Sequence, residues 1–287
     1  MRTITIRLWI VFLISMPTII IAQTKDRDVL SVGLNDSGKP FKLNINLAGG
    51  SVSISTHKSS ELRIVATLQE SAHESKDQGK NRNNNINTNT NANVNTAASS
   101  STIAGNKLLK VSQNGNEVLI GQQNENLALH VELSLPEIST LLKLFLNGKG
   151  DIDITGVAGQ LEITSTNGPI ILKNIAGSAV ANTVNGNITA TFRSVNTKSP
   201  MAFSTLNGDI DLSFPPAVKA SLAIKSDEGN LFSSLNLTGP ARNNLIRSKN
   251  GQYQTKLAGS LSGNLNGGGQ RITITNMTGN IYLRKSN

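Results

Sequence analysis

The chain alternates apolar and polar residues in short blocks that repeat every nine residues. In the regular blocks, the second and fourth residues after an initial glycine are aliphatic. The glycines of the uninterrupted section are Gly150, Gly159, Gly168, Gly177 and Gly186. Alternation with a period of two is typical of a strand with one buried face, and the spacing of an amphipathic helix is absent from these blocks. Each block therefore predicts a short strand and a turn, and their repetition predicts a β-solenoid.

The pattern continues on both sides of this section when small insertions are allowed. Further blocks begin at Phe41, Gly50, Ser199, Gly208, Ala220, Gly229, Gln270 and Gly279. The two aliphatic side chains of a block point to one face, so two blocks are needed to enclose a core. We therefore expect an all-β fold, a single-stranded parallel β-helix with about 18–22 residues per coil. In such a stack Ile152, Ile170, Ile188 and Ile210 form one column.

An Asn-Gly pair recurs at Asn167-Gly168, Asn185-Gly186 and Asn207-Gly208. Both residue types tolerate positive φ, so the pair favours a tight corner. Corners stacked in register would also align the asparagines into a side-chain amide ladder. Asn-Gly is equally typical of a two-residue hairpin, which leaves an antiparallel meander as the alternative. The joint recurrence of glycine, aliphatic residues and asparagine favours the stacked parallel arrangement.

The N-terminus has the features of an export signal. Arg2 and Arg7 precede an apolar run that ends near Ala22. The run is shorter than the ~20 residues that span a bilayer. Residues 1–22 therefore predict a cleaved signal peptide, with an uncleaved anchor as the alternative.

The remaining chain divides by composition. More than half of the residues between Asn81 and Thr96 are asparagine. Such a segment buries too little apolar surface to offset the conformational entropy that it would lose on ordering. The expected divisions are an N-terminal linker (23–40), the first solenoid strands (41–69), an Asn-rich disordered insertion (70–105) and a β-solenoid with C-terminal closing strands (106–287).

Charge and cysteine content narrow the function classes. The formal net charge of +9 falls to +7 when Arg2 and Arg7 leave with the signal. Such a charge suits an acidic polysaccharide or anionic surface, but a dispersed, solvated basic exterior is the favoured interpretation. Aromatic residues are only 3% of the chain, so a nucleic-acid surface with stacked bases is not expected. The absence of cysteine excludes disulfides, thiolate nucleophiles and cysteine-ligated metals.

Outward carboxylates are the best candidates for enzyme chemistry. They are Asp151, Asp153, Glu162, Asp209 and Asp211. Asp151 and Asp209 occupy equivalent positions three coils apart, roughly 14 Å, beyond the ~5–9.5 Å of a glycosidase pair. Glu162 belongs to the opposite face of the coil. These carboxylates are therefore interpreted as solvated surface groups.

Other catalytic or metal-binding patterns are weak. His57, His73 and His130 are widely separated and lack the spacing of a zinc site. Calcium-binding nonapeptide repeats need more acids than the single Gly148-Lys149-Gly150-Asp151 turn offers. The Gly267–Gly269 run precedes a strand rather than a helix, unlike a nucleotide loop. The sequence thus gives no catalytic, cofactor-binding or metal residue.

The repeated T-x-N-G motif resembles the adhesin-like DUF4097 family of bacterial proteins. It occurs at Thr166-Asn167-Gly168, Thr183–Ile188 and Thr205–Ile210. Val131–Pro136 and Leu265–Gly269 are also similar, the latter to members from Bacteroidetes. The resemblance covers residues 40–285 outside the Asn-rich insertion. It implies a secreted or surface β-helix, with no binding residues carried over.

The sequence therefore predicts a non-enzymatic protein exported by a Gram-negative bacterium to the periplasm, outer surface or medium. Its expected role is an adhesin-like binding module or cell-envelope scaffold, with a cell-surface glycan or envelope protein as partner. A polysaccharide-acting β-helix enzyme and a periplasmic envelope-stress or assembly factor are the alternatives. No cofactor, nucleic acid or transmembrane segment of the mature chain is expected, and the oligomeric state is left open.

Overall fold

The computed structural model describes residues 27–34, 39–69, 101–102, 107–196, 198–239, 246–247 and 252–286. Within these ranges the chain forms strands and no helix. The all-β expectation is confirmed. The strands are β1 (Arg27–Gly33), β2 (Phe41–Leu47), β3 (Gly50–His57), β4 (Glu61–Leu68), β5 (Ser101–Thr102), β6 (Leu109–Asn114), β7 (Glu117–Gln122), β8 (Leu129–Pro136), β9 (Thr140–Lys149), β10 (Ile152–Thr155), β11 (Ala158–Asn167), β12 (Ile170–Asn185), β13 (Ile188–Val195), β14 (Met201–Asn207), β15 (Ile210–Phe214), β16 (Ala220–Ser233), β17 (Leu237–Thr238), β18 (Ile246–Arg247), β19 (Tyr253–Leu265), β20 (Gln270–Thr278) and β21 (Ile281–Lys285).

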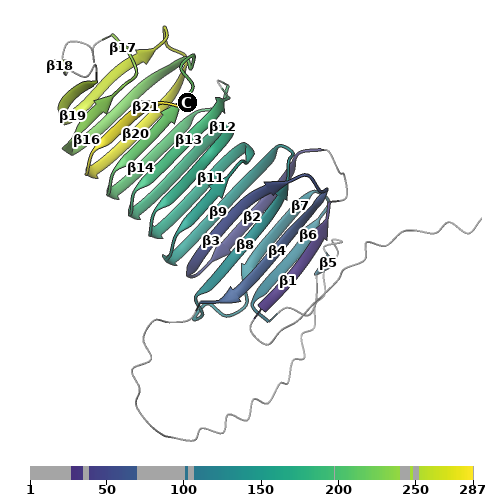
Figure 1. The fold of residues 1–287 in the computed structure, drawn as a ribbon. Coiled ribbons are helices and arrows are strands. Elements are labelled where there is room, and N and C mark those ends of the chain that lie inside the picture. Colours follow the sequence, from purple (N-terminus) through teal and green to yellow (C-terminus); the bar gives the residue numbers. More distant parts are fainter. Residues whose placement is uncertain are drawn as a thin grey trace, which may run out of the picture.

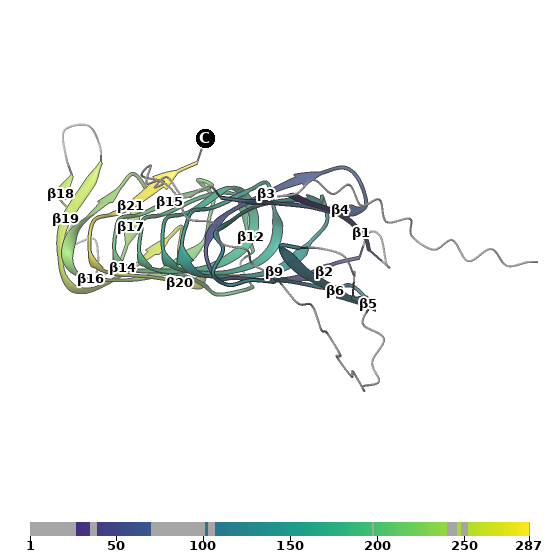
Figure 2. The same cartoon turned by 90° about the horizontal axis from the view of Figure 1, so that it is seen from below.

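The strands stack into an elongated, flattened coil with two layers, seen along its length in Figure 1 and from below in Figure 2. We call them layers A and B. Layer A contains, in spatial order, β1, β4, β8, β3, β10, the first half of β12, β13, β15, β21 and the second half of β16. Layer B contains β5, β6, β7, β2, β9, β11, the second half of β12, β14, β20, the first half of β16 and the second half of β19. The first half of β19 pairs with the second half of β16 in layer A. This arrangement is solenoid-like.

The core lies between the layers and consists of aliphatic columns. Ile152 pairs with Ile170, Ile170 with Ile188, and Ile188 with Ile210, all in parallel. The expected isoleucine column is therefore confirmed, and each member is fully buried. Burial of one such side chain stabilises the fold by about 1.5–3 kcal/mol, so the repeated column is a principal source of stability.

The corners between the layers stack backbone on backbone. The amide of Gly168 donates to the carbonyl of Asn185 at 2.8 Å, and the amide of Gly186 donates to that of Asn207 at 2.9 Å. A Cβ built on Gly168 would lie 1.9 Å from the Gly150 carbonyl oxygen, and one on Gly186 would lie 2.2 Å from that of Gly168. Both glycines have positive φ. Glycine is required here because no side chain fits between successive corners.

Asparagine side chains run beside these corners as a ladder, as the sequence predicts. Asn185 Nδ2 donates to Asn167 Oδ1 at 2.8 Å, and Asn207 Nδ2 donates to Asn185 Oδ1 at 2.8 Å. Thr278 Oγ1 continues the ladder by donating to Asn207 Oδ1 at 2.9 Å. Asn185 and Asn207 each donate and accept in this ladder, which links consecutive coils.

The stack departs from a purely parallel helix at both ends. Near the N-terminus β4 is antiparallel to β1 and β8, and β6 is antiparallel to β7. At the other end β19 is antiparallel to β16. A parallel coil leaves open strand edges at its ends, and strands that reverse direction extend the pairing at these edges.

Two sequence-based boundaries need correction. Residues 23–40 were expected to be a linker, yet β1 lies within this range and buries Leu30 and Val32. The buried carboxylate of Asp28 accepts a hydrogen bond of 2.8 Å from the backbone amide of Leu108. This contact joins β1 to the residue just before β6. The range 70–105 includes β5, which pairs with β6. The predicted signal peptide (1–22) and the rest of that Asn-rich range lie outside the described residues.

Spatial neighbours are not sequence neighbours at two points of layer B. β2 lies between β7 and β9, and β14 pairs with β20 rather than with β16. The order of the strands in this layer therefore departs from the order in the sequence twice. The first of these departures places the outer face of β2 beside strands that come much later in the sequence.

The isoleucine column predicts the effect of a buried charge. We expect Ile188→Asp to abolish cooperative folding. The free-energy cost of burying an isolated carboxylate in a dry core exceeds the typical free energy of unfolding of about 5–15 kcal/mol. Val184→Asp places the same charge on the exposed surface of the adjoining strand β12, away from other acidic side chains. This control should keep the wild-type thermal midpoint in circular dichroism, and equal midpoints for the two variants would contradict the inward assignment.

The glycine corner predicts a second effect on stability. We expect Gly168→Ala to lower the free energy of unfolding by about 2–5 kcal/mol, through the left-handed backbone and the steric overlap. Gly121 in β7 is the matched control, because a Cβ there meets nothing within 4 Å. Chemical denaturation should show Gly121→Ala within about 0.5 kcal/mol of wild type. A similarly small loss for Gly168→Ala would refute the close stacking of the corners.

Candidate functional site

The carboxylates that the sequence singles out are dispersed and mostly paired with cations. Asp153 lies 2.6 Å from Lys173 Nζ, and Glu162 lies 2.8 Å from Lys143 Nζ. Asp211 accepts two hydrogen bonds from Arg284 Nε at 2.8 and 2.9 Å. Each pair joins neighbouring strands on an outer face. These carboxylates therefore serve as cross-strand links.

The two remaining acidic residues lie at the corners. Asp209 Oδ1 accepts the backbone amide of Asn280 at 2.7 Å, and the Asp209 amide donates to Asn187 Oδ1 at 2.9 Å. The backbone carbonyl of Asp151 accepts a hydrogen bond of 2.9 Å from the Val52 amide. As expected, Asp151 and Asp209 occupy equivalent corner positions several coils apart.

The histidines do not gather into one site. His57 caps a turn, with Nε2 2.9 Å from the Glu61 carbonyl and Nδ1 accepting the Ser59 amide at 3.1 Å. His73 lies outside the described residues. In the described part of the chain, histidine and acidic side chains form no cluster of three suited to a metal.

His130 takes part in a hydrogen-bonded chain that the sequence does not reveal. Its Nδ1 lies 2.6 Å from Ser51 Oγ, and its Nε2 lies 3.1 Å from Glu132 Oε1. Ser51 and His130 face each other because β3 and β8 pair in parallel. The order serine, histidine, carboxylate is that of a serine hydrolase, with the two ring nitrogens exchanged.

The surroundings of this chain do not suit acyl transfer. The side chains of His130 and Glu132 are 40% and 58% exposed, so water screens their interaction. The next backbone amide, that of Val52, already donates to the Asp151 carbonyl at 2.9 Å and is not free to stabilise an oxyanion. The trio is best explained as a polar link between β3 and β8.

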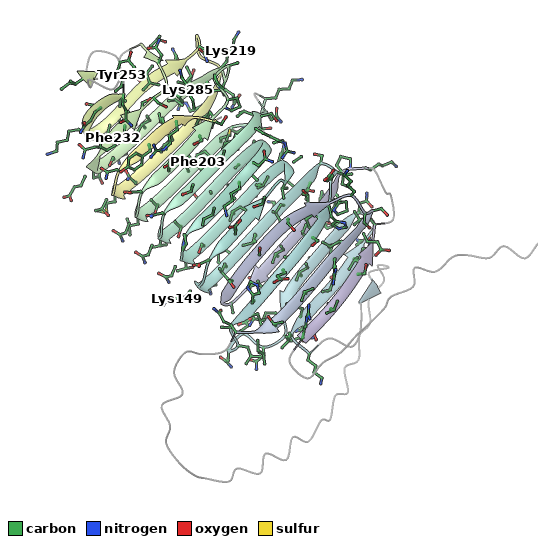
Figure 3. The ribbon with its side chains drawn as sticks, in the orientation of Figure 1. Lys149, Phe203, Lys219, Phe232, Tyr253 and Lys285 are labelled. Carbon is green, nitrogen blue, oxygen red and sulfur yellow. The ribbon has the colours of Figure 1, made fainter. Side chains whose placement is uncertain are left out.

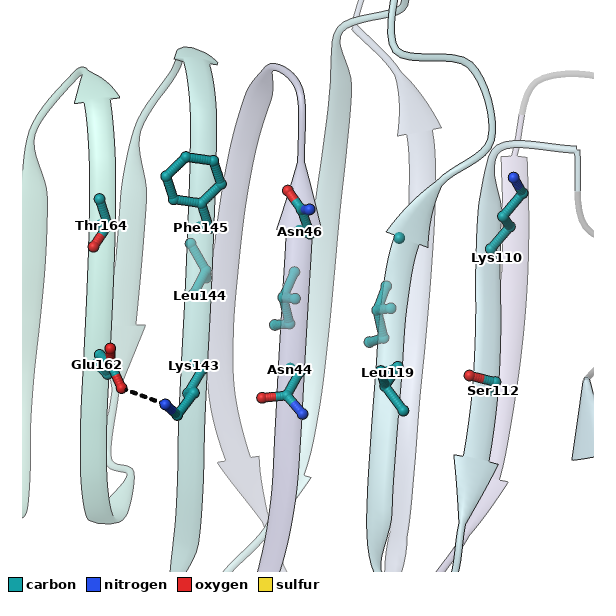
Figure 4. Close-up of a pocket in the computed structure, with 13 residues that line it drawn as sticks. Asn44, Asn46, Lys110, Ser112, Leu119, Lys143, Leu144, Phe145, Glu162 and Thr164 are labelled. Atoms are coloured by element: carbon teal, nitrogen blue, oxygen red, sulfur yellow. Dashed lines mark ion pairs between the residues drawn. The ribbon is translucent and has the colours of Figure 1, made fainter. Parts of the chain in front are cut away.

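The outer face of layer B carries a groove (Figure 4). It has a volume of about 440 Å³. It lies over β6, β7, β2, β9 and β11, which pair in that order. Its outward residues form two rows across the strands. The first row is Thr164, Phe145, Asn46, Gly121 and Lys110, and the second is Glu162, Lys143, Asn44, Leu119 and Ser112.

Local sequence explains why Phe145 faces water. Leu142, Leu144 and Leu146 of β9 point inward and are buried. Alternation then directs Phe145 outward, where its side chain is 43% exposed. Gly121 has no side chain to fill the space between Asn46 and Lys110, so the surface is hollowed there. An outward phenylalanine in an alternating strand was the available sequence signal for this site.

A second aromatic group lies near the C-terminal end of the stack, where Figure 3 labels Phe232. The rings of Phe232 and Tyr282 stack with centroids 5.1 Å apart. The guanidinium of Arg284 lies 5.0 Å from the Tyr282 centroid. Its hydrogen bonds to Asp211 raise the pKa of Arg284, which keeps this side chain cationic. The Tyr282 ring is thus engaged by side chains of the protein itself.

The sequence profile of the Toastrack DUF4097 family matches residues 16–284. The chain belongs to the Toastrack DUF4097 family. The match covers both layers and both ends of the stack, and it confirms the resemblance carried by the T-x-N-G corners. Among curated proteins, none matches this Toastrack chain significantly.

One solved structure is similar to this Toastrack chain. It is a proposed cell adhesion protein from Clostridium sporogenes, 14% identical, with a TM-score of 0.43. The similarity covers 91% of this chain and 99% of that one. Within the described residues, no helix is long and apolar enough to cross a membrane.

The Ser51 chain leads to a prediction about reactivity. We expect a fluorophosphonate probe to leave the folded protein unmodified, because the Val52 amide next to Ser51 is already hydrogen-bonded and the His130 base is solvated. Intact-mass spectrometry checks this, with Ser51→Ala as the matched control. An adduct that forms on the wild type and disappears in Ser51→Ala would contradict a purely structural role.

Proposed function

We propose that this Toastrack protein is an exported, non-enzymatic binding module of the cell envelope, adhesin-like in its action. In this proposal the central part of the chain is a single-stranded β-helix with about 18–22 residues per coil. In this proposal the outer face of layer B is the contact surface, and a surface glycan is the leading ligand. The observation that carries the proposal is the groove around Phe145.

The groove has the composition of a sugar-binding surface. Phe145 is the exposed phenylalanine among the described residues, and the amides of Asn44 and Asn46 lie next to it on β2. Saccharides combine apolar C–H faces with hydroxyl groups, which an aromatic ring and amide groups can bind together. The volume of about 440 Å³ lies within the ~300–1,000 Å³ range of small-molecule sites.

The fold supports binding better than catalysis. A rigid stack offers a long surface of repeated strand positions, which suits a repetitive ligand. Three of the five outward carboxylates that a polysaccharide-acting enzyme could use as acid and base are instead paired with Lys173, Lys143 and Arg284. An enzyme is therefore the weaker proposal.

A periplasmic envelope-stress or assembly factor is the other candidate role. The open strand edges at the ends of the stack favour it, because an extended segment of a partner can add to such an edge. This role predicts a protein partner and no affinity for glycans.

Glycan-array binding by the mature protein tests the proposal. We expect wild type to bind a subset of glycans, and Phe145→Ala to lose at least about tenfold in affinity through the loss of the aromatic contact. Leu206→Ala is the matched control, because Leu206 is 44% exposed on the same layer but lies outside the groove.

Pull-down from envelope extracts separates the two candidate roles. Specific retention of one envelope protein, without glycan binding, would replace the adhesin-like role by the assembly role. Equal glycan binding by wild type and Phe145→Ala would remove the groove from the proposal.

A further inference from the structure

The two ends of the groove differ in chemistry. Phe145 forms an apolar wall on β9, and Lys110 forms the opposite rim on β6. Asn46 and Gly121 lie between them in the same row. Three strand spacings, about 14 Å, separate the two rims. A ligand that spans the groove therefore meets a ring at one end and a cation at the other (Figure 4).

Most polar groups around the groove already have partners inside the protein. Lys143 forms its ion pair with Glu162, in which both side chains are 53% exposed. Asn44 Nδ2 donates to Glu117 Oε1 at 2.8 Å. These contacts neutralise the second row of the groove.

The first row keeps its polar groups available. Within the described residues, the ammonium of Lys110 has no ion pair or hydrogen bond, and neither does the side-chain amide of Asn46. The residues that line the groove thus carry one unpaired positive charge, together with two N–H donors and one carbonyl acceptor. The carboxylate of Glu125 lies in the adjoining hollow that shares Asn46, Gly121 and Phe145.

The floor of the groove is open. Gly121 lies directly between Asn46 and Lys110, and a Cβ placed on it would meet nothing within 4 Å. The space above Gly121 therefore belongs to solvent or ligand. A longer side chain at this position would fill the groove without contact with the core.

We propose that the groove binds an acidic saccharide, a sugar chain that carries carboxylates of the uronic acid type. Its carboxylate pairs with Lys110, its hydroxyl groups bond to the Asn46 amide, and a C–H face of one ring lies against Phe145. A neutral sugar would gain no charge-assisted hydrogen bond from Lys110, and a purely apolar ligand would gain no hydrogen bond from the Asn46 amide. This inference rests on the proposed glycan-binding function and names its ligand class.

The test compares acidic oligosaccharides with their uncharged forms. The probes are trigalacturonate, trimannuronate and a hyaluronan tetrasaccharide, each beside its carboxyl methyl ester, measured by calorimetry on the mature protein. We expect an acid to bind at least about tenfold more tightly than its ester, the value of one charge-assisted hydrogen bond. Affinity for the acid should fall as ionic strength rises.

Three variants assign the binding to the groove. Lys110→Gln should reduce affinity for the acid about tenfold and leave the ester unchanged. Phe145→Ala should weaken both forms, and Gly121→Leu should block both while the thermal midpoint is retained. Lys225→Gln, an exposed lysine on β16 of the same layer, is the matched control and should bind as wild type.

The outcomes separate this inference from the proposed function. If esters and acids bind equally and Lys110→Gln has no effect, the acidic ligand class is wrong while glycan binding stands. If the folded protein binds sugars but none of the acids in preference to its ester, the inference also fails. If it binds no sugar on the array or in calorimetry, both the inference and the proposed function fail.

Discussion

The structure depends on the close approach of one corner backbone to the next. At Gly168 and Gly186 the space for a Cβ is occupied by the carbonyl oxygen of the preceding coil. The backbone hydrogen bonds across these corners fix the axial step between coils. With that step fixed, every inward side chain lies above its equivalent, and the isoleucine column and the asparagine ladder follow. The corner geometry therefore determines both the core and the surface.

The same constraint explains how distant segments build one surface. β2 enters the stack between β7 and β9 because its Leu43 and Ile45 match Val118 and Ile120 on one side and Leu142 and Leu144 on the other. The outer residues of β2 come into register at the same time. Asn46 thereby lies between Phe145 and Gly121, and the groove is assembled from segments that the sequence separates.

The sequence predicts the regular part of this fold well. Glycine, aliphatic and asparagine positions recur together from Gly150 to Gly208, and each has one physical role in a stacked corner. The same pattern could not predict β1, because its burial depends on β4 and on the contact of Asp28 with Leu108 rather than on a repeat. It could not predict the insertion of β2 either, since alternation defines which face is buried but not which strand lies alongside.

The candidate site was less accessible to sequence analysis than the fold. The acidic residues that attract attention in the sequence are tied to cations such as Lys173 and Arg284. The groove forms instead because Gly121 has no side chain to fill it and because Phe145 points outward from a leucine-rich strand. These two features can be recognised as parts of one site only when the strand order is known.

The stack and the groove both depend on the strand order across layer B. The chain has no native cysteine, so single cysteines at positions 110 and 164 can carry a specific pair of spin labels. In the order β6, β7, β2, β9, β11 these positions are four strand spacings apart, about 19 Å between backbones. Pulsed electron paramagnetic resonance should give one narrow distance distribution consistent with that separation. A broad distribution, or one centred far beyond it, would contradict the stack and the groove together.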